Sequence, residues 1–272
     1  MSHRATSSPR ASAALALVVL LAILWAVLGL SAQDASGVAA TEIGKTKKTP
    51  KPSCPTAKED NPPAYKTCQA VGEVTGLQTR AAGEVNPYKV PADGRLVAWS
   101  IDLSRPDESE IKFFTDEPAG GPDVENGVGW GDPSARISVL KKLKHQRFKL
   151  AKQSSKVELG SQYGKSPIFT MRKPMRVKAG QFVAITTANW FPNLAHDAPV
   201  TTQGGDVWLA SRGAKHCGQA PAGASVQEAI AAQQDAIDHS KPQQKKGSVR
   251  PYKCRYTAAR LLYSAFFVPD GK

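Results

Sequence analysis

Hydrophobic and polar residues alternate along much of the chain after Ala70. In one segment Val97, Trp99 and Ile101 are separated by small or polar residues, which leaves one face apolar. A period of two is typical of β-strands with one buried face. The same period recurs at residues 136–139, 147–150, 168–172 and 182–187.

Two further features complete the predicted fold class. The segment Ala258–Val268 is apolar at nearly every position, which predicts a central strand covered on both faces. Turn residues separate the strands, and in Pro91–Gly94 the Asp-Gly pair can supply the positive φ of a tight reversal. Roughly ten strands with frequent turns predict an all-β fold, a jelly-roll-like antiparallel β-sandwich.

One segment has a helical rather than a strand pattern. Ala222–Ser240 contains Ser225 followed three residues later by Glu228, the pattern of a capping box at a helix N-terminus. The apolar stripe that follows is thin and rich in alanine. We therefore expect one surface helix within an insertion at 218–253.

The N-terminal region has a different pattern. An unbroken apolar run, Ala13–Leu30, follows Arg4 and Arg10, which is typical of a segment that directs export. Its length suits either a cleaved signal or a single transmembrane helix within residues 1–32, and both remain open. Either way the rest of the chain is expected outside the cytoplasm, secreted or tethered to the outer face of the cytoplasmic membrane.

Residues 33–53 are predicted to be a disordered linker. Small and polar residues dominate, and four lysines (Lys45, Lys47, Lys48 and Lys51) form a basic string. Too few apolar residues are present to offset the entropy of ordering. The segment would act as a spacer, or contact anionic lipids if the apolar run is retained. The folded domain is then expected to span 54–272.

Four cysteines in an oxidising compartment predict two disulfides. Three pairings are possible, and we favour that of sequence neighbours, which joins Cys54 to Cys68 and Cys217 to Cys254. The second of these bonds would close the helical insertion. A zinc site is the alternative. It is disfavoured because the cysteines are widely spaced and no C-x-x-C pair occurs, although His216 lies beside Cys217.

The strongly positive charge of the chain bears on the kind of partner it could bind. The formal net charge is +13, and six cations between Lys141 and Lys152 have no acid among them. Such a balance favours an anionic envelope polymer or acidic glycan as partner, although self-repulsion that keeps a protein soluble gives the same composition. Nucleic acid is not expected, because the only aromatic residue in this run, Phe148, has the spacing of a buried position.

Two motifs resemble a known group of proteins. The Pro91–Trp99 hairpin and the segment Pro174–Gly180, which leads into an apolar strand, resemble exported β-sandwich proteins of high-GC bacteria. The resemblance covers roughly residues 70–212 and 255–269. It implies fold and export, and supplies no active-site residues because the functions of that group are not established.

Catalytic and cation-binding candidates are few, and no cofactor is expected. His196-Asp197 is an adjacent acid–base pair on a predicted loop. A carboxylate pair within Asp107–Glu110 could serve glycoside hydrolysis, but a solvated acidic turn after Pro106 is favoured. The acidic, glycine-rich segment 116–132 could bind calcium, although its order does not match an EF-hand.

Aromatic residues near predicted loops give the most specific functional hypothesis. Exposed tryptophan rings stack on sugars. The candidate glycan platform comprises Trp190, Trp208, Asn189, Asp206 and Arg212. The competing interpretation is that the rings fill the open end of the sandwich.

These observations together predict a non-enzymatic exported or membrane-tethered module that binds carbohydrate or another envelope component. A structural or adhesive surface protein that binds another protein is the alternative. A hydrolase acting through His196 and Asp197 is less favoured.

Overall fold

The computed structural model describes residues 39–52, 70–116, 129–196, 205–218, 223–257 and 259–271. Several predictions concern residues outside these ranges: the apolar run 13–30, Cys54 with Cys68, Asp197, and most of the acidic segment 116–132. Within the described ranges, neither helix has both the length and the apolar character that crossing a bilayer requires.

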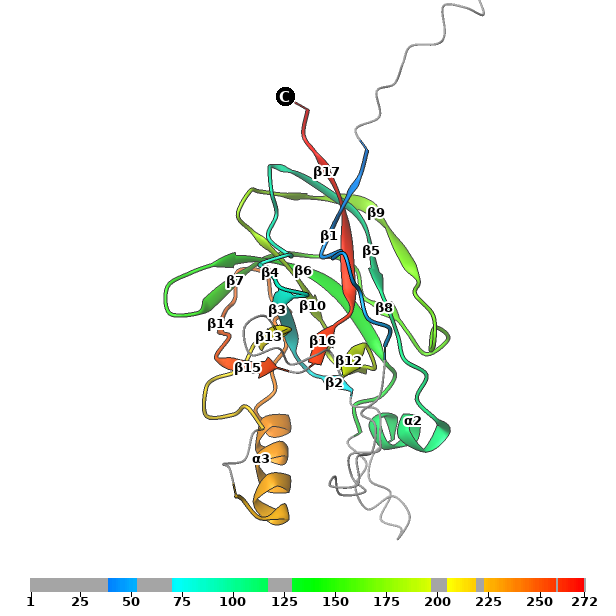
Figure 1. The fold of residues 1–272 in the computed structure, drawn as a ribbon, viewed down its shortest axis with the longest axis vertical. Helices are drawn as coiled ribbons and strands as arrows, with labels where there is room; N and C mark the ends of the chain where they lie inside the picture. Colours follow the sequence, from blue (N-terminus) through cyan, green and yellow to red (C-terminus); the bar gives the residue numbers. More distant parts are fainter. Residues whose placement is uncertain are drawn as a thin grey trace, which may run out of the picture. The chain divides into compact units, whose positions relative to one another are not determined.

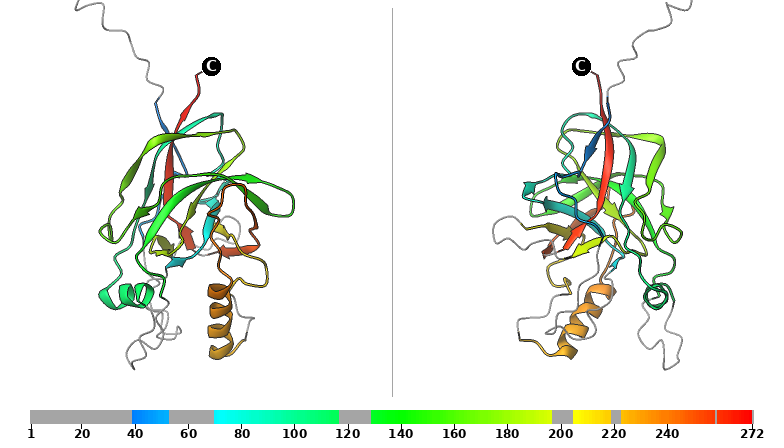
Figure 2. Two further views of the ribbon diagram at one scale, coloured as in Figure 1. Left: turned by 180° about the vertical axis from the view of Figure 1, so that it is seen from behind. Right: turned by 45° about the vertical axis from the view of Figure 1, so that its right-hand side comes forward.

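The described residues are mostly β, and their antiparallel strands curl into a half-barrel (Figures 1 and 2). One sheet has the order β1 (Thr41–Ile43), β17 (Tyr263–Pro269), β5 (Gly94–Ile101) and β9 (Ile168–Val177). The larger sheet has the order β14 (Val249–Pro251), β7 (Arg147–Gln153), β6 (Ser134–Lys142), β10 (Phe182–Thr186), β3 (Thr75–Ala81), β13 (Val207–Ala210) and β15 (Cys254–Thr257).

Short strands complete the fold. Two of them extend the larger sheet: β4 (Glu84–Val85) pairs with β3, and β8 (Val157–Glu158) pairs with β6. The others form two separate two-stranded sheets, in which β2 (Val71–Gly72) pairs with β11 (Trp190–Phe191), and β12 (Leu194–His196) pairs with β16 (Ala259–Leu261). The predominance of antiparallel β-strands is thus confirmed.

The core lies along the inner faces of these sheets. Trp99 is 2% exposed, and all five residues of β10 are buried between β6 and β3. Phe148 is also buried, as its spacing predicts. Burial of such apolar side chains is the main force that holds the sheets together.

The predicted central strand is present, with an interruption. β17 pairs with β1 on one side and β5 on the other, so it is central. The predicted continuous segment is divided at Leu262, whose carbonyl accepts from Asp102 and whose N–H donates to Asn193. The break separates β16 from β17.

Part of the predicted linker is ordered, which corrects that prediction for residues 39–52. β1 pairs with β17 in register Thr41 to Phe267, and Ile43 is 6% exposed. The buried Arg260 donates to the carbonyl of Lys48 (3.1 Å) and the hydroxyl of Thr46 (2.9 Å). Pairing with a strand edge and contact with a buried guanidinium compensate for the low apolar content.

Two helices are described, whereas the sequence pattern predicts one. α3 (Val226–Asp238) lies in the late insertion and begins with the predicted Ser225–Glu228 capping box. α2 (Glu108–Thr115) replaces the predicted acidic turn. The Asp107 side chain caps this helix, and the Glu110 carboxylate accepts from the Asp107 N–H (2.8 Å). These acids therefore serve helix initiation.

Gly94 is needed for a reason other than the predicted one. It is not among the residues with positive φ, whereas Gly180 has a φ of 80°. A Cβ at Gly94 would collide with the carbonyl oxygen of Val268 on β17. Close strand approach therefore requires glycine here.

Candidate functional site

Trp190 lies in the interior. Its side chain is fully buried, and its indole N–H donates to the carbonyl of Gly131 (2.8 Å). The ring packs against Phe114 and Tyr163, with centroid separations of 4.9 and 6.0 Å. This ring is therefore a packing element between α2 and the sheets.

Trp208 is buried in a second aromatic cluster. It is 7% exposed and stacks on Tyr256 at a centroid separation of 4.3 Å. Neither Trp208 nor Trp190 offers an open ring face to a ligand. The exposed platform expected from the sequence is thus corrected, because residues distant in the chain pack over both rings.

The polar members of that set have structural contacts. Asn189 donates to the carbonyl of Trp130 (2.7 Å) and accepts from Ser134 (2.9 Å). Asp206 accepts from the Ala82 N–H (2.8 Å), and Arg212 donates to the Tyr256 hydroxyl (3.3 Å) and the Gly72 carbonyl (3.3 Å). Each side chain joins separate segments, so the set does not converge on one groove.

The pairing of Cys217 with Cys254 is confirmed. The bond connects β15 to the loop that precedes α3, so it closes the helical insertion as predicted. The Tyr256 hydroxyl donates to the carbonyl of Cys217 (2.7 Å), and the backbone N–H of His216 donates to the carbonyl of Gly213 (3.1 Å). These contacts hold the loop around His216 in place.

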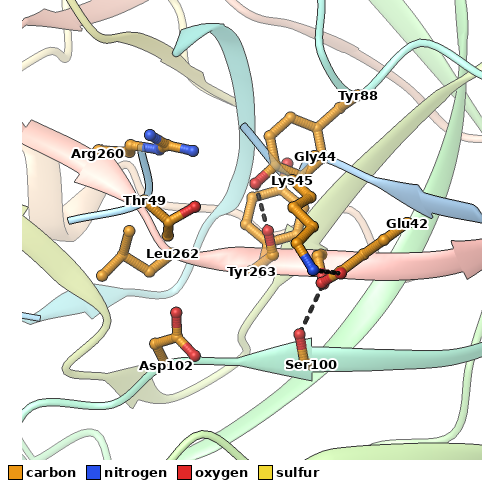
Figure 3. Close-up of a pocket in the computed structure, with 11 residues that line it drawn as sticks. Glu42, Gly44, Lys45, Thr49, Tyr88, Ser100, Asp102, Arg260, Leu262 and Tyr263 are labelled. Carbon is orange, nitrogen blue, oxygen red and sulfur yellow. Dashed lines mark hydrogen bonds and ion pairs between the residues drawn. The ribbon is translucent and has the colours of Figure 1, made fainter. Parts of the chain in front are cut away.

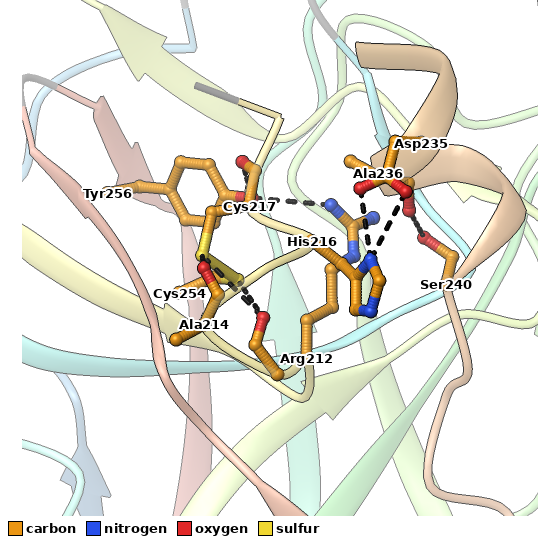
Figure 4. The surroundings of a disulfide bond; sticks show 10 residues. Arg212, Ala214, His216, Cys217, Asp235, Ala236, Ser240, Cys254 and Tyr256 are labelled. Carbon is orange, nitrogen blue, oxygen red and sulfur yellow. Dashed lines mark hydrogen bonds and ion pairs between the residues drawn. A yellow bond between two sulfur atoms is a disulfide. The ribbon is translucent and has the colours of Figure 1, made fainter. Parts of the chain in front are cut away.

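Beside the disulfide, His216 points at the carboxylate of Asp235 (Figure 4), and His239 contacts the same carboxylate. His216 Nδ1 lies 3.0 Å from one oxygen of Asp235, and His239 Nδ1 lies 3.0 Å from the other. The two imidazole rings stack at 3.8 Å with an interplanar angle of 12°. Nitrogen and carboxylate donors of this kind are ligands for transition metals.

A small polar hollow lies between residues 42–49 and the start of β17 (Figure 3). Its volume is about 110 Å³, and Arg260 and Asp102 lie on different sides of it. Glu42 forms an ion pair with Lys45 (3.1 Å) and accepts from Ser264 (2.6 Å) at its edge. Ligand pockets usually enclose about 300–1,000 Å³, so this hollow suits a few waters.

A second hollow, near the turn that precedes β5, has a volume of about 250 Å³. Lys152, Arg176 and Lys178 line it together with Asp93 and Asp270. The Asp93 carboxylate accepts from the Ala179 N–H (2.8 Å), which ties two turns together at this site. Both hollows are smaller than a typical enclosed site for an organic ligand.

Positive charge is concentrated on the β6–β7 hairpin. We define the basic face as four exposed cations, Lys141, Lys144, Arg147 and Lys149. The exposed Lys142 lies opposite the buried Phe148, so it points to the other side of the hairpin. Lys141 lies directly opposite Lys149 in the β6–β7 register, and Lys149 in turn lies opposite Val249 of β14. Residues directly opposite in antiparallel strands point to the same side, so Lys141 and Lys149 share one face.

The basic face has further cations at its margin. Lys245 and Lys246 are exposed in the turn that leads to β14, and that turn is bonded to Leu150 of β7 through backbone groups. None of these six cations forms an ion pair with a described residue. Their charges are therefore available to an anionic partner.

Two of these features are not evident in the sequence pattern. Asp235 and His239 have the i, i+4 spacing that places side chains on one helix face, and His216 stands out in the sequence only as a neighbour of Cys217. The arrival of Lys245 and Lys246 beside β7 depends on β14 pairing, which no local pattern indicates. For His196 the structure gives only its backbone position in β12.

No protein-family model matches the chain, and no curated protein or solved structure is significantly similar to it.

Proposed function

We propose that this chain is an exported, non-enzymatic module that binds an anionic glycan of the cell envelope through the basic face. The single observation that carries the proposal is the pair of exposed lysines, Lys141 and Lys149, held opposite each other with further cations around them. Like charges placed directly opposite destabilise a sheet. A bound polyanion relieves that repulsion.

The shape of the face supports a polymer rather than a small molecule. The hairpin and the turn at residues 245–246 present their charges on an open surface, whereas the two hollows described above are small. A chain of repeating carboxylates or phosphates can contact several such cations at once. Each contact is weak by itself, so several together are needed for useful affinity.

Export is part of the proposal. The apolar run at residues 13–30 and the resemblance to exported proteins motivate it, and the disulfide between Cys217 and Cys254 is compatible with an oxidising compartment. We also propose the jelly-roll-like sandwich as the finer description of the fold. Its support is the antiparallel pairing of two main sheets around one core.

The test measures binding to polygalacturonate, which carries carboxylates, heparin, which carries sulfates, and neutral dextran. We expect binding to both acidic glycans and none to dextran, with weaker binding at high salt because ions screen exposed charges. The double variant Lys141→Glu/Lys149→Glu should weaken binding by about tenfold or more.

The matched control is Arg172→Glu/Lys173→Glu on β9, which changes the net charge equally at exposed positions in the other sheet. Equal loss in both double variants would mean that total charge, not the basic face, determines binding. Tighter binding to single-stranded DNA than to either glycan, competed by neither, would assign the face to nucleic acid instead.

A further inference from the structure

We propose that His216, Asp235 and His239 form a binding site for a divalent transition metal such as Zn²⁺ or Ni²⁺. This site is independent of the proposed glycan binding. The three side chains can each supply one ligand atom, and those atoms lie within 4.8 Å of one another. Tetrahedral ligands bound to one ion at about 2.0–2.2 Å lie roughly 3.4 Å apart, so the two 3.0 Å separations seen here have to widen only slightly.

The three donors come from two parts of the chain, the C-terminal end of α3 and the loop that precedes it. Asp235 lies in the last turn of α3 and His239 is its C-cap residue, so helical geometry brings them to the same side. His216 comes from the other side of the disulfide-closed loop, one residue before Cys217. The covalent link and the Tyr256–Cys217 hydrogen bond limit how far His216 can move from Asp235.

The donors are accessible to an ion. Their side chains are 32%, 39% and 50% exposed for His216, Asp235 and His239. An ion can enter from solvent, and coordination positions not occupied by protein stay open to water. Three protein ligands with an open position are typical of exchangeable rather than closed structural zinc sites.

The donor set selects the class of metal. Two imidazole nitrogens and one carboxylate suit Zn²⁺, Ni²⁺, Co²⁺ or Cu²⁺. Ca²⁺ and Mg²⁺ prefer a shell of oxygens. Metal also competes with protons for the imidazole nitrogens, so affinity should fall as the pH is lowered.

One side chain has to move when the metal binds. A metal lies in the plane of each imidazole that binds it, and two nearly parallel rings at 3.8 Å cannot share one ion. His239 is the ring that turns, because it is half exposed and follows the helix end, with φ −99° and ψ 7°. His216 and Asp235 then provide the preformed half of the site.

Calorimetric titration of the full, tag-free chain with Zn²⁺ and Ni²⁺ tests this site. We expect one equivalent to bind and at least about a tenfold loss of affinity in each of His216→Ala, Asp235→Asn and His239→Ala. His145→Ala is the matched control, since His145 is exposed on the β6–β7 hairpin. It should leave the affinity unchanged.

A second measurement does not depend on affinity alone. Nitrogen-detected NMR of the histidine rings should show two imidazoles perturbed by one equivalent of Zn²⁺, and Asp235→Asn should need a larger excess of Zn²⁺ for the same perturbation. Absence of binding, or binding that all three substitutions leave unchanged, would overturn the proposal. Circular dichroism of each variant separates loss of the site from loss of folding.

Discussion

The buried guanidinium of Arg260 donates a hydrogen bond to the hydroxyl of Thr46, which lies 214 residues away in the sequence (Nη2 to Oγ1, 2.9 Å). A second bond reaches the carbonyl of Lys48 (3.1 Å). Arg260 is only 2% exposed. One side chain from β16 thus fastens a segment that sequence composition alone marks as disordered.

We expect Arg260→Leu to lower the free energy of unfolding by about 2 kcal/mol, because two charge-assisted hydrogen bonds are lost. The substitution should also release the segment around Lys45–Lys48 for cleavage by trypsin. Urea unfolding and timed proteolysis measure the two effects. Arg95→Leu is the control, since Arg95 has only a surface ion pair with Asp270, and it should cost less than about 0.5 kcal/mol. Trypsin resistance equal to that of the parent would contradict this assignment.

The double substitution Cys217→Ala/Cys254→Ala should destabilise the protein by up to about 4 kcal/mol. The bond closes a loop with a sequence separation of 37, and an open loop has more conformational entropy in the unfolded chain. Chemical denaturation under oxidising conditions measures the change and leaves Cys54 and Cys68 unaltered. A cost below about 1 kcal/mol would show that the insertion is held by its other contacts.

Lys141→Glu should have opposite effects on stability and binding. It replaces a like-charge pair with Lys149 by an opposite-charge pair, which should raise the free energy of unfolding by about 0.5 kcal/mol. It should also weaken binding to polygalacturonate. Denaturant unfolding and a binding isotherm on the same preparation reveal both changes. Loss of stability together with loss of binding would indicate damage to the hairpin rather than removal of a binding charge.

Glu73→Gln should stabilise the protein at neutral pH. Burial raises the pKa of Glu73 above its ordinary value, and the charge of Arg212 and a hydrogen bond from Trp130 offset this only in part. An acid with a raised pKa in the folded state binds its proton more tightly there. Protonated Glu73 therefore adds to the free energy of unfolding, and this stabilisation is complete below pH 4.5. It is lost as the pH rises through the pKa that Glu73 has in the folded protein.

The amide introduced by Glu73→Gln would resemble the protonated acid, so the gain should disappear below pH 4.5. We expect no more than about 0.5 kcal/mol at neutral pH, because the carboxylate keeps part of its solvent. Urea unfolding at the two pH values measures it. Glu84→Gln, at an exposed position of β4, is the control. A gain that persists in acid would rule out the carboxylate as its cause.

Alternation and local capping patterns predict much of the fold. The strands around Trp99 and Phe148 follow from period-two patterning, and α3 follows from Ser225 and Glu228. α2 does not stand out in the sequence although Asp107 and Glu110 have the same spacing, because the helix after them is only 8 residues long. Short helices give too few residues for a periodic pattern to show.

Features that depend on distant pairing are not predictable in this way. β1 has few apolar residues, and its order comes from β17 and Arg260. Trp190 lies next to loop residues in the sequence, yet Phe114 and Tyr163 cover its ring. Exposure of a single aromatic residue is decided by such long-range contacts, so its role as a platform could not be judged from composition.

The central place of β17 has a consequence for biosynthesis. Tyr263 of β17 pairs with Ile101 of β5. The ribosome must therefore add about 160 residues after β5 before the edge of β5 that faces β17 can form its hydrogen bonds. During this interval β5 presents unpaired N–H and C=O groups that can capture another nascent molecule. The β5 edge is therefore a site for aggregation until β17 is available to pair with it.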